Sequence, residues 1–172
     1  PRLTIGKGMT LKFAENTGMG VGEYPYGAAE LWAIGANYPD SIITFTSLNG
    51  KPGGWNGIAY SNGSNNQKSY LKNCVIENAK DNNLSMDRTN QPSIDSCIVR
   101  NATGRGIYTY SSSFIMKNST VYGNGQQGMY GIQGNNAITV DNCSFYNNVT
   151  NGFEVSGDLK FLHSKIYGNG KT

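Results

Sequence analysis

Cysteine, proline and histidine are scarce in this chain of 172 residues, which contains 3 cysteines, 5 prolines and 1 histidine. The cysteines are odd in number and lack the spacing of a disulfide framework. We therefore expect buried free thiols that act as small hydrophobic side chains. Zinc binding is disfavoured because there is no Cys-x-x-Cys motif and no histidine pair. The sequence predicts no metal site and no resident cofactor.

Long hydrophobic runs and long amphipathic helical patterns are also missing. No apolar run approaches the roughly 18 residues that a membrane span requires, so we expect no membrane insertion. Only 15% of the residues are charged, the net charge is +3, and the lysines and arginines are scattered. This distribution disfavours nucleic acid as a partner, because nucleic-acid-binding proteins concentrate basic residues on one face.

Glycine, tyrosine and asparagine are abundant instead, with 23 glycines and 11 tyrosines in the chain. Short apolar runs separated by such residues are typical of many short strands joined by tight turns. One phrase recurs: STVYGNG at Ser119–Gly125 returns as SKIYGNG at Ser164–Gly170, and NCSFYNN at Asn142–Asn148 is the copy between them. The chain is therefore built from repeats.

The repeat can be followed from the first residue of that phrase, which we call the marker. The marker column contains Cys74, Cys97, Ser119, Cys143 and Ser164, at steps of 23, 22, 24 and 21 residues. The residues three positions before and two positions after the marker are apolar in every copy, and asparagine follows after four or five positions. A unit of this length cannot bury its own apolar face. The units must therefore stack, about 4.8 Å apart, with like residues above one another.

We predict an all-β fold, a right-handed parallel β-helix (β-solenoid) of about seven to eight turns of roughly 21–24 residues each. The chain should form a single domain over residues 1–172, with regular turns in 67–172 and loop-bearing turns in 1–66. Loops are expected at 22–27 and 47–54. Exposed β-helix ends present unpaired strand edges. We therefore expect the chain to be part of a longer protein, or its ends to be covered by other segments or end-to-end neighbours.

Four segments carry a specific resemblance, in the order LTIGKGMTLKF, ITFTS, PGGWNGI and LKNCVIENA. In these segments and their order, the chain resembles bacterial secreted right-handed β-helix repeat proteins of the pectin-lyase-like superfamily. The resemblance implies the fold, its handedness and an extracellular or cell-surface location in a bacterium. It implies no particular activity, because that superfamily includes lyases, hydrolases, phage tailspikes, adhesins and modules without known chemistry. No catalytic motif of its enzymes maps onto this sequence.

Carboxylates that could act as a catalytic pair are sparse on the outward side of the second strand of each unit. Asp87 and Glu154 lie three units apart, which is about 14 Å and too far for the carboxylate pair of a glycoside hydrolase. A different outward column alternates in sign, and we interpret it as a stacked surface array. It contains Lys72, Asp95, Lys117 and Asp141.

β-Elimination of an acidic polysaccharide is a second catalytic possibility. It requires a base and a group, often calcium, that neutralises the substrate carboxylate. Asp87, Arg88 and Arg105 could converge with Tyr108 for this purpose, and calcium would then be the cofactor. The catalytic candidates of the chain are Asp87, Arg88, Arg105 and Glu154. The competing interpretation is that arginine beside tyrosine is an ordinary surface pairing.

The strongest candidate for a binding surface is aromatic. Tyr108 and Tyr130 share an outward column on adjacent units, preceded by Ser85 and followed by Glu154. Flat tyrosine rings with polar neighbours can stack on sugar rings and hydrogen-bond their hydroxyls, although tyrosine also simply suits a strand surface. Trp32 is either a second contact or a buried side chain. The predicted ligand-binding residues are Tyr108, Tyr110, Tyr130, Asp87, Glu154 and Trp32.

These observations favour a non-catalytic extracellular module, a rigid scaffold whose tyrosine-bearing face binds a polysaccharide or a cell-surface glycan. A polysaccharide lyase or glycoside hydrolase acting on the face between Ser85 and Glu154 is the first alternative. A purely structural repeat segment, in which the tyrosines have no ligand, is the second.

Overall fold

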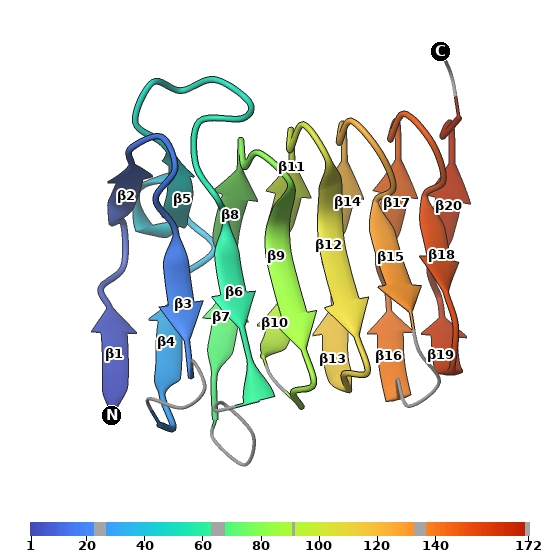
Figure 1. Cartoon of the computed structure of the whole chain (residues 1–172), viewed down its shortest axis with the longest axis horizontal. Helices are drawn as coiled ribbons and strands as arrows, with labels where there is room; N and C mark the ends of the chain where they lie inside the picture. Colours follow the sequence, from blue (N-terminus) through green and yellow to red (C-terminus); the bar gives the residue numbers. More distant parts are fainter. Residues whose placement is uncertain (23–26, 63–67, 91, 133–136, 171–172) are drawn as a thin grey trace.

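The computed structural model describes residues 1–22, 27–62, 68–90, 92–132 and 137–170. Over these residues the chain winds as a coil, and strands from successive turns pair in parallel to form three sheets (Figure 1). Each full turn contributes one strand to each sheet, in the order sheet A, sheet B, sheet C. The predicted all-β parallel β-helix is confirmed.

The bounds of the strands show how they are distributed among the sheets. Sheet A contains β1 (Arg2–Ile5), β4 (Glu30–Ile34), β7 (Tyr70–Lys72), β10 (Ser93–Asp95), β13 (Phe114–Lys117), β16 (Ala137–Asp141) and β19 (Asp158–Leu162). Sheet B contains β2 (Thr10–Phe13), β5 (Ile43–Ser47), β8 (Cys74–Glu77), β11 (Ile98–Arg100), β14 (Thr120–Tyr122), β17 (Ser144–Tyr146) and β20 (Lys165–Tyr167). Sheet C contains β3 (Met19–Val21), β6 (Ile58–Tyr60), β9 (Asn82–Asp87), β12 (Arg105–Tyr110), β15 (Met129–Ile132) and β18 (Phe153–Val155). A short 3-10 helix, η1 (Pro39–Ser41), precedes β5.

Within the described residues, the strands make six complete turns and the first two strands of a seventh. The prediction of seven to eight turns was slightly high, because the first turns are longer than the repeat. Arg2 pairs with Glu30, 28 residues later, and the next step along sheet A is 38 residues. The extra length includes η1 and the predicted loop at 47–54, which leads from β5 towards β6. Of the predicted loop at 22–27, residues 23–26 lie outside the described residues.

The predicted register is confirmed in sheets A and B. The apolar column before the marker pairs in sheet A, as Leu71, Ile94, Met116, Val140 and Phe161. The apolar column after the marker pairs in sheet B, as Ile76, Val99, Val121, Phe145 and Ile166. All three cysteines of the marker column are buried free thiols in the interior. Because burial raises the pKa of the Cys97 and Cys143 thiols, neither is a ready nucleophile at neutral pH.

The asparagines that follow the marker form two columns rather than the single one predicted. In each of the five turns that contain a marker, the fourth position after it has a left-handed backbone, with φ between 52° and 67°, at Asn78, Asn101, Gly123, Asn147 and Gly168. The fifth position carries a ladder of amides, in which Asn124 Nδ2 donates to Asn148 Oδ1 and Asn148 Nδ2 donates to Asn169 Oδ1, each at 2.9 Å. The first column turns the chain from sheet B towards sheet C, and the second ties neighbouring turns together.

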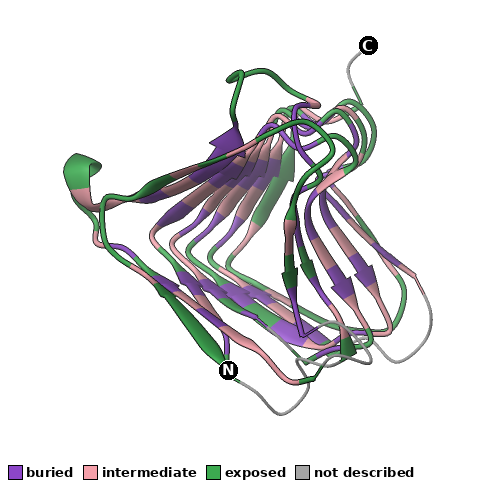
Figure 2. Ribbon diagram, turned by 60° about the vertical axis from the view of Figure 1, so that its left-hand side comes forward, coloured by how far each residue is buried: buried purple, intermediate pink, exposed green. Residues whose placement is uncertain are grey.

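The inward side chains of the three sheets fill one continuous core. Buried residues alternate mainly with partly buried ones along the strands of the middle turns (purple and pink in Figure 2), because successive side chains of a strand point to opposite faces. Trp55 lies in the connection between β5 and β6 and closes the core there, because its ring stacks on Phe13 at 4.5 Å and its Nε1 donates to the Glu77 carbonyl oxygen at 2.8 Å. The outward side chains therefore form straight columns along the axis, and a binding site on this fold is built from such columns.

Candidate functional site

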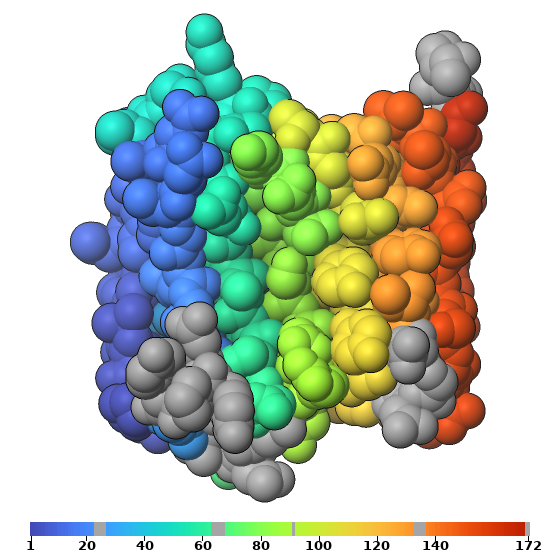
Figure 3. Space-filling model, in the orientation of Figure 1, coloured from blue at the N-terminus to red at the C-terminus, as the bar shows by residue number. Residues whose placement is uncertain are grey.

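The outer side of sheet C carries most of the residues predicted from the sequence to bind a ligand. The strands place Tyr108 between Ser85 and Tyr130 in one outward column, and Glu154 continues that column in the next turn. Tyr110 pairs with Asp87 in the column beside it. This surface faces the viewer in Figures 1 and 3. We call it the sheet C face, and it consists of Ser85, Asp87, Arg88, Arg105, Tyr108, Tyr110, Tyr130 and Glu154.

Two tyrosine rings and an arginine form the centre of the sheet C face. The ring centroids of Tyr108 and Tyr130 are 6.3 Å apart, and the planes are inclined by 26°. The Arg105 guanidinium carbon lies 4.7 Å from the Tyr130 centroid and 5.8 Å from the Tyr108 centroid, within range of a cation–π contact. Arg105 Nε also donates to Gln127 Oε1 at 3.2 Å. The hydrogen bond to Gln127 therefore helps to fix the Arg105 guanidinium beside the two tyrosine rings.

An ion pair borders the same face at the end of β9. Arg88 has a left-handed backbone, with φ of 49°. Its Nε and one terminal nitrogen each donate to the Asp87 carboxylate at 3.0 Å, and this bonding raises the pKa of the Arg88 guanidinium. Asp87, Arg88, Tyr108 and Tyr110 line an open surface depression of about 370 Å³. Both charged groups remain accessible to a ligand.

The catalytic candidates do not converge on one point. Glu154 accepts hydrogen bonds from Gln127 Nε2 at 3.1 Å and Asn151 Nδ2 at 2.9 Å, so it belongs to the polar group of Arg105. Asp87 and Arg88 form a separate ion pair, one turn before Arg105 and three turns before Glu154. Within the described part of the chain, no group of three or more histidine, cysteine, aspartate or glutamate residues is arranged to hold a metal ion.

Trp32 does not belong to the sheet C face. It lies in β4 of sheet A, paired with Tyr70 of β7. Its Nε1 donates to the Lys68 carbonyl oxygen at 2.7 Å, and the Arg2 guanidinium covers its ring at 3.8 Å from the centroid. Trp32 and the tyrosines of sheet C therefore cannot contact the same sugar unit.

Sequence reasoning missed a second aromatic array, on the outer side of sheet B. Tyr122, Tyr146 and Tyr167 stack with centroids 4.9 Å and 5.1 Å apart and planes inclined by only 3° and 11°. We call these three residues the sheet B tyrosine ladder. The signal was present in the repeated phrase itself, because each tyrosine is the third residue after a marker.

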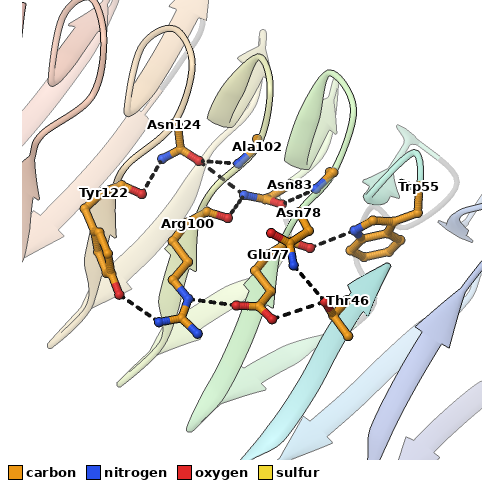
Figure 4. A network of polar contacts seen from close by, with 10 residues as sticks. Thr46, Trp55, Glu77, Asn78, Asn83, Arg100, Ala102, Tyr122 and Asn124 are labelled. Carbon is orange, nitrogen blue, oxygen red and sulfur yellow. Dashed lines mark hydrogen bonds and ion pairs between the residues drawn. The ribbon is translucent and has the colours of Figure 1, made fainter. Parts of the chain in front are cut away.

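A polar chain leads into the first ring of this ladder (Figure 4). Thr46 donates to Glu77 Oε1 at 3.1 Å, and Arg100 Nε donates to Glu77 Oε2 at 2.7 Å. Arg100 then donates to the Tyr122 hydroxyl at 2.9 Å. The hydrogen bond to Tyr122 and the contact with Glu77 raise the pKa of Arg100, while burial and the neighbouring phenols raise the pKa of Tyr146. Tyr146, the middle ring of the ladder, is therefore a neutral phenol at neutral pH.

The alternating column on sheet A has the predicted register. Lys72, Asp95, Lys117 and Asp141 follow one another in paired strands. Lys72 Nζ lies 3.3 Å from Asp95 Oδ2. Partial burial acts to raise the pKa of Asp95, but hydrogen bonds from Asn118 and Ser96, together with Lys72, lower it overall. Opposite charges in neighbouring turns thus offset each other along this column.

Comparison with known proteins agrees with this architecture. A family model described as "Right handed beta helix region" matches residues 33–172, and the chain belongs to that family of right-handed parallel β-helix proteins. Neither the curated proteins nor the solved structures contain a match to the chain. In the described residues, no helix has the length and apolarity needed to cross a membrane.

Proposed function

We propose that the protein is a non-catalytic extracellular module, a rigid β-helix scaffold whose sheet C face binds a polysaccharide or a cell-surface glycan. The observation that carries the proposal is the open depression lined by Asp87, Arg88, Tyr108 and Tyr110. Phenol rings supply apolar surface for the C–H groups of a sugar. The ion-paired Asp87 and Arg88 supply an acceptor and donors for its hydroxyl groups.

A polymer suits this face better than a single sugar. The depression is shallow and open, so one sugar unit would stay largely in solvent and gain little affinity. Tyr130 and Glu154 continue the same column over the following two turns. A polysaccharide chain lying along the axis would make several weak contacts at once. Because the sugar units are linked, these contacts together give a much higher affinity than any one of them alone.

The hydrogen bonding of the carboxylates supports a binding role over a catalytic one. A glycoside hydrolase places its two carboxyl groups about 5–9.5 Å apart. Asp87 and Glu154 are separated by three turns, at about 4.8 Å per turn, and each is bonded within its own polar group. The extracellular location rests on the resemblance to secreted bacterial β-helix proteins.

Affinity electrophoresis tests the proposal. The protein is run in native gels that contain pectin, alginate, xylan or β-glucan, and we expect retardation by at least one of them. Tyr108→Ala combined with Tyr130→Ala should abolish that retardation. Tyr38→Ala is the matched control, because Tyr38 is 70% exposed and lies beside η1, away from sheet C.

Two results would overturn the proposal. If the double variant is retarded as strongly as the parent protein, the tyrosines of sheet C have a structural role only. If incubation with the same polysaccharides releases unsaturated or reducing ends, the protein is a lyase or a hydrolase acting on the face between Ser85 and Glu154.

A further inference from the structure

Two parallel files of hydroxyl groups run along the outer side of sheet B. One file is the tyrosine ladder of Tyr122, Tyr146 and Tyr167. The other file contains Thr120 and Ser144, which pair with each other in the outward column beside it. We call these five residues the sheet B hydroxyl face. Together they bring the phenolic hydroxyls of three successive turns, and the aliphatic hydroxyls of the first two, to one surface.

Ring stacking alone does not require tyrosine at these positions. The nearly parallel rings contact one another through their faces, which phenylalanine would do equally well. Among the described residues, the hydroxyls of Tyr146, Tyr167, Thr120 and Ser144 have no hydrogen-bond partner. These hydroxyl groups are therefore free to serve a ligand, whereas the ring faces that meet within the ladder are already occupied.

The first hydroxyl of the ladder is oriented by its neighbours. Because the Tyr122 oxygen accepts a hydrogen bond from Arg100, its own proton is available to an outside acceptor. The Arg100 charge is offset by Glu77, which lies 2.7 Å away. Near the ladder this leaves Lys165 as the charged residue, at the outward position that pairs with Ser144. Among the described residues, an acidic polymer with one carboxylate per unit would meet only this one unpaired cation over three turns, so a neutral, hydroxyl-rich ligand fits the surface better.

The spacing of the ladder narrows the choice of polymer. Its rings repeat every 4.9–5.1 Å along the axis. An extended peptide repeats the side chains of one face about every 6.6–6.8 Å, and a nucleic-acid strand, with one phosphate per about 3.4 Å, requires basic partners. Neither repeat fits. Sugars joined by equatorial β-1,4 bonds form an extended chain whose unit length is close to the ladder spacing.

We propose that the sheet B hydroxyl face is a second binding surface, which takes an extended, neutral β-1,4-linked polysaccharide chain lying along the axis with one sugar unit per turn. It is independent of the sheet C face and uses different chemistry. Because the ring faces are occupied, the hydroxyls recognise the sugar hydroxyls by hydrogen bonding. Single contacts of this kind are weak, so affinity should rise steeply with chain length.

Calorimetric titration tests this surface in the Tyr108→Ala/Tyr130→Ala background, in which the sheet C face has lost its central rings. The probes are cellohexaose and xylohexaose, with maltohexaose as the matched control. Maltohexaose has the same glucose units as cellohexaose, but its α-1,4 bonds coil the chain. We expect one of the extended hexasaccharides to bind at least about tenfold more tightly than maltohexaose, and free glucose to give no measurable heat.

A conservative triple variant assigns the binding to the hydroxyls. Replacing Tyr122, Tyr146 and Tyr167 by phenylalanine in that background keeps the stack and removes three hydroxyl groups. We expect a melting temperature close to that of the background protein, because the only intramolecular hydrogen bond lost among the described residues is the partly buried one from Arg100 to the Tyr122 hydroxyl, and a loss of affinity of about tenfold or more. The proposal is overturned if neither extended hexasaccharide binds, if maltohexaose binds as well as they do, or if the triple variant retains full affinity. The sheet C proposal fails on a different result, namely that the Tyr108→Ala/Tyr130→Ala variant is retarded by the polysaccharide as strongly as the parent protein.

Discussion

Replacing Asn148 by alanine should break the amide ladder that joins three turns of the coil. The Asn148 side chain is 1% exposed, and its Oδ1 accepts from the backbone nitrogen of Asn124 at 3.2 Å and from Asn124 Nδ2 at 2.9 Å. Its Nδ2 donates to Asn169 Oδ1 at 2.9 Å. The substitution therefore leaves two N–H groups of the fully buried Asn124 without their acceptor. One is the backbone N–H, and the other is one of the two on Nδ2, whose second N–H still bonds to the Tyr122 carbonyl oxygen at 3.2 Å.

The expected cost follows from these two orphaned donors. Leaving a buried donor unsatisfied costs about 1–3 kcal/mol, so with two of them Asn148→Ala should lower the free energy of unfolding by about 2–6 kcal/mol. In a chain of this size, each kcal/mol shifts the melting temperature by about 2–4 °C, which predicts a drop of roughly 4–24 °C. Urea titration and a thermal melt, both followed by circular dichroism, measure the two quantities.

The adjacent residue supplies the matched control. Asn147 is exposed and has a left-handed backbone, with φ of 52°, at a position where Gly123 and Gly168 stand in neighbouring turns. Asn147→Gly should change the free energy of unfolding by no more than about 0.5 kcal/mol. If Asn148→Ala costs no more than Asn147→Gly, the amide ladder does not hold the turns together and the interpretation of this corner is wrong.

Three further substitutions test the core, the corner and the charged column. Ile107→Asp should abolish the cooperative melt, because it buries an unpaired carboxylate in a fully buried column, whereas Ile107→Val should cost only about 0.5–1.5 kcal/mol. Gly106→Ala should lower the free energy of unfolding, measured by urea titration, by about 1–3 kcal/mol. The reason is that a Cβ at this position would lie 2.6 Å from the Gly128 carbonyl oxygen and 2.8 Å from Asn124 Nδ2. An unchanged free energy of unfolding would contradict the close packing of this corner. Asp95→Asn should reduce stability at pH 7 by up to about 1 kcal/mol. Because the pKa of Asp95 is lowered on folding, its contribution is present above the unfolded pKa and lost as the pH falls through the folded one. The difference between parent and variant should therefore shrink in acid, and a difference that grows as the pH falls would refute the assignment.

The repeat in the sequence was sufficient to predict the architecture and the register. Cys74, Cys97 and Cys143 could be aligned because each turn must bury the same face against its neighbours, so the pattern of apolar residues reports the stacking directly. The number of turns was less predictable. Loops in the first turns increase the number of residues between paired strands, as between Trp32 and Tyr70, although the strands still stack in the same way.

The surface chemistry was only partly predictable. Tyr108 and Tyr130 could be assigned to one column by alternation, but the hydrogen bonds that place Arg105 and Glu154 in one group depend on side-chain conformations. The two asparagine columns were merged because they are adjacent in the sequence, and only the backbone angles separate them. Trp32 was grouped with the tyrosines by residue type, although the winding of the chain places it on another sheet.

The central claim is that stacking of successive turns brings Tyr108 and Tyr130 together as parts of one binding face. A double-mutant cycle of polysaccharide affinity, using Tyr108→Ala, Tyr130→Ala and the combined variant, measures this most directly. If one sugar chain spans both rings, the two losses should be coupled by about 0.5–3 kcal/mol. Losses that add independently, or single variants that bind as well as the parent protein, would contradict it.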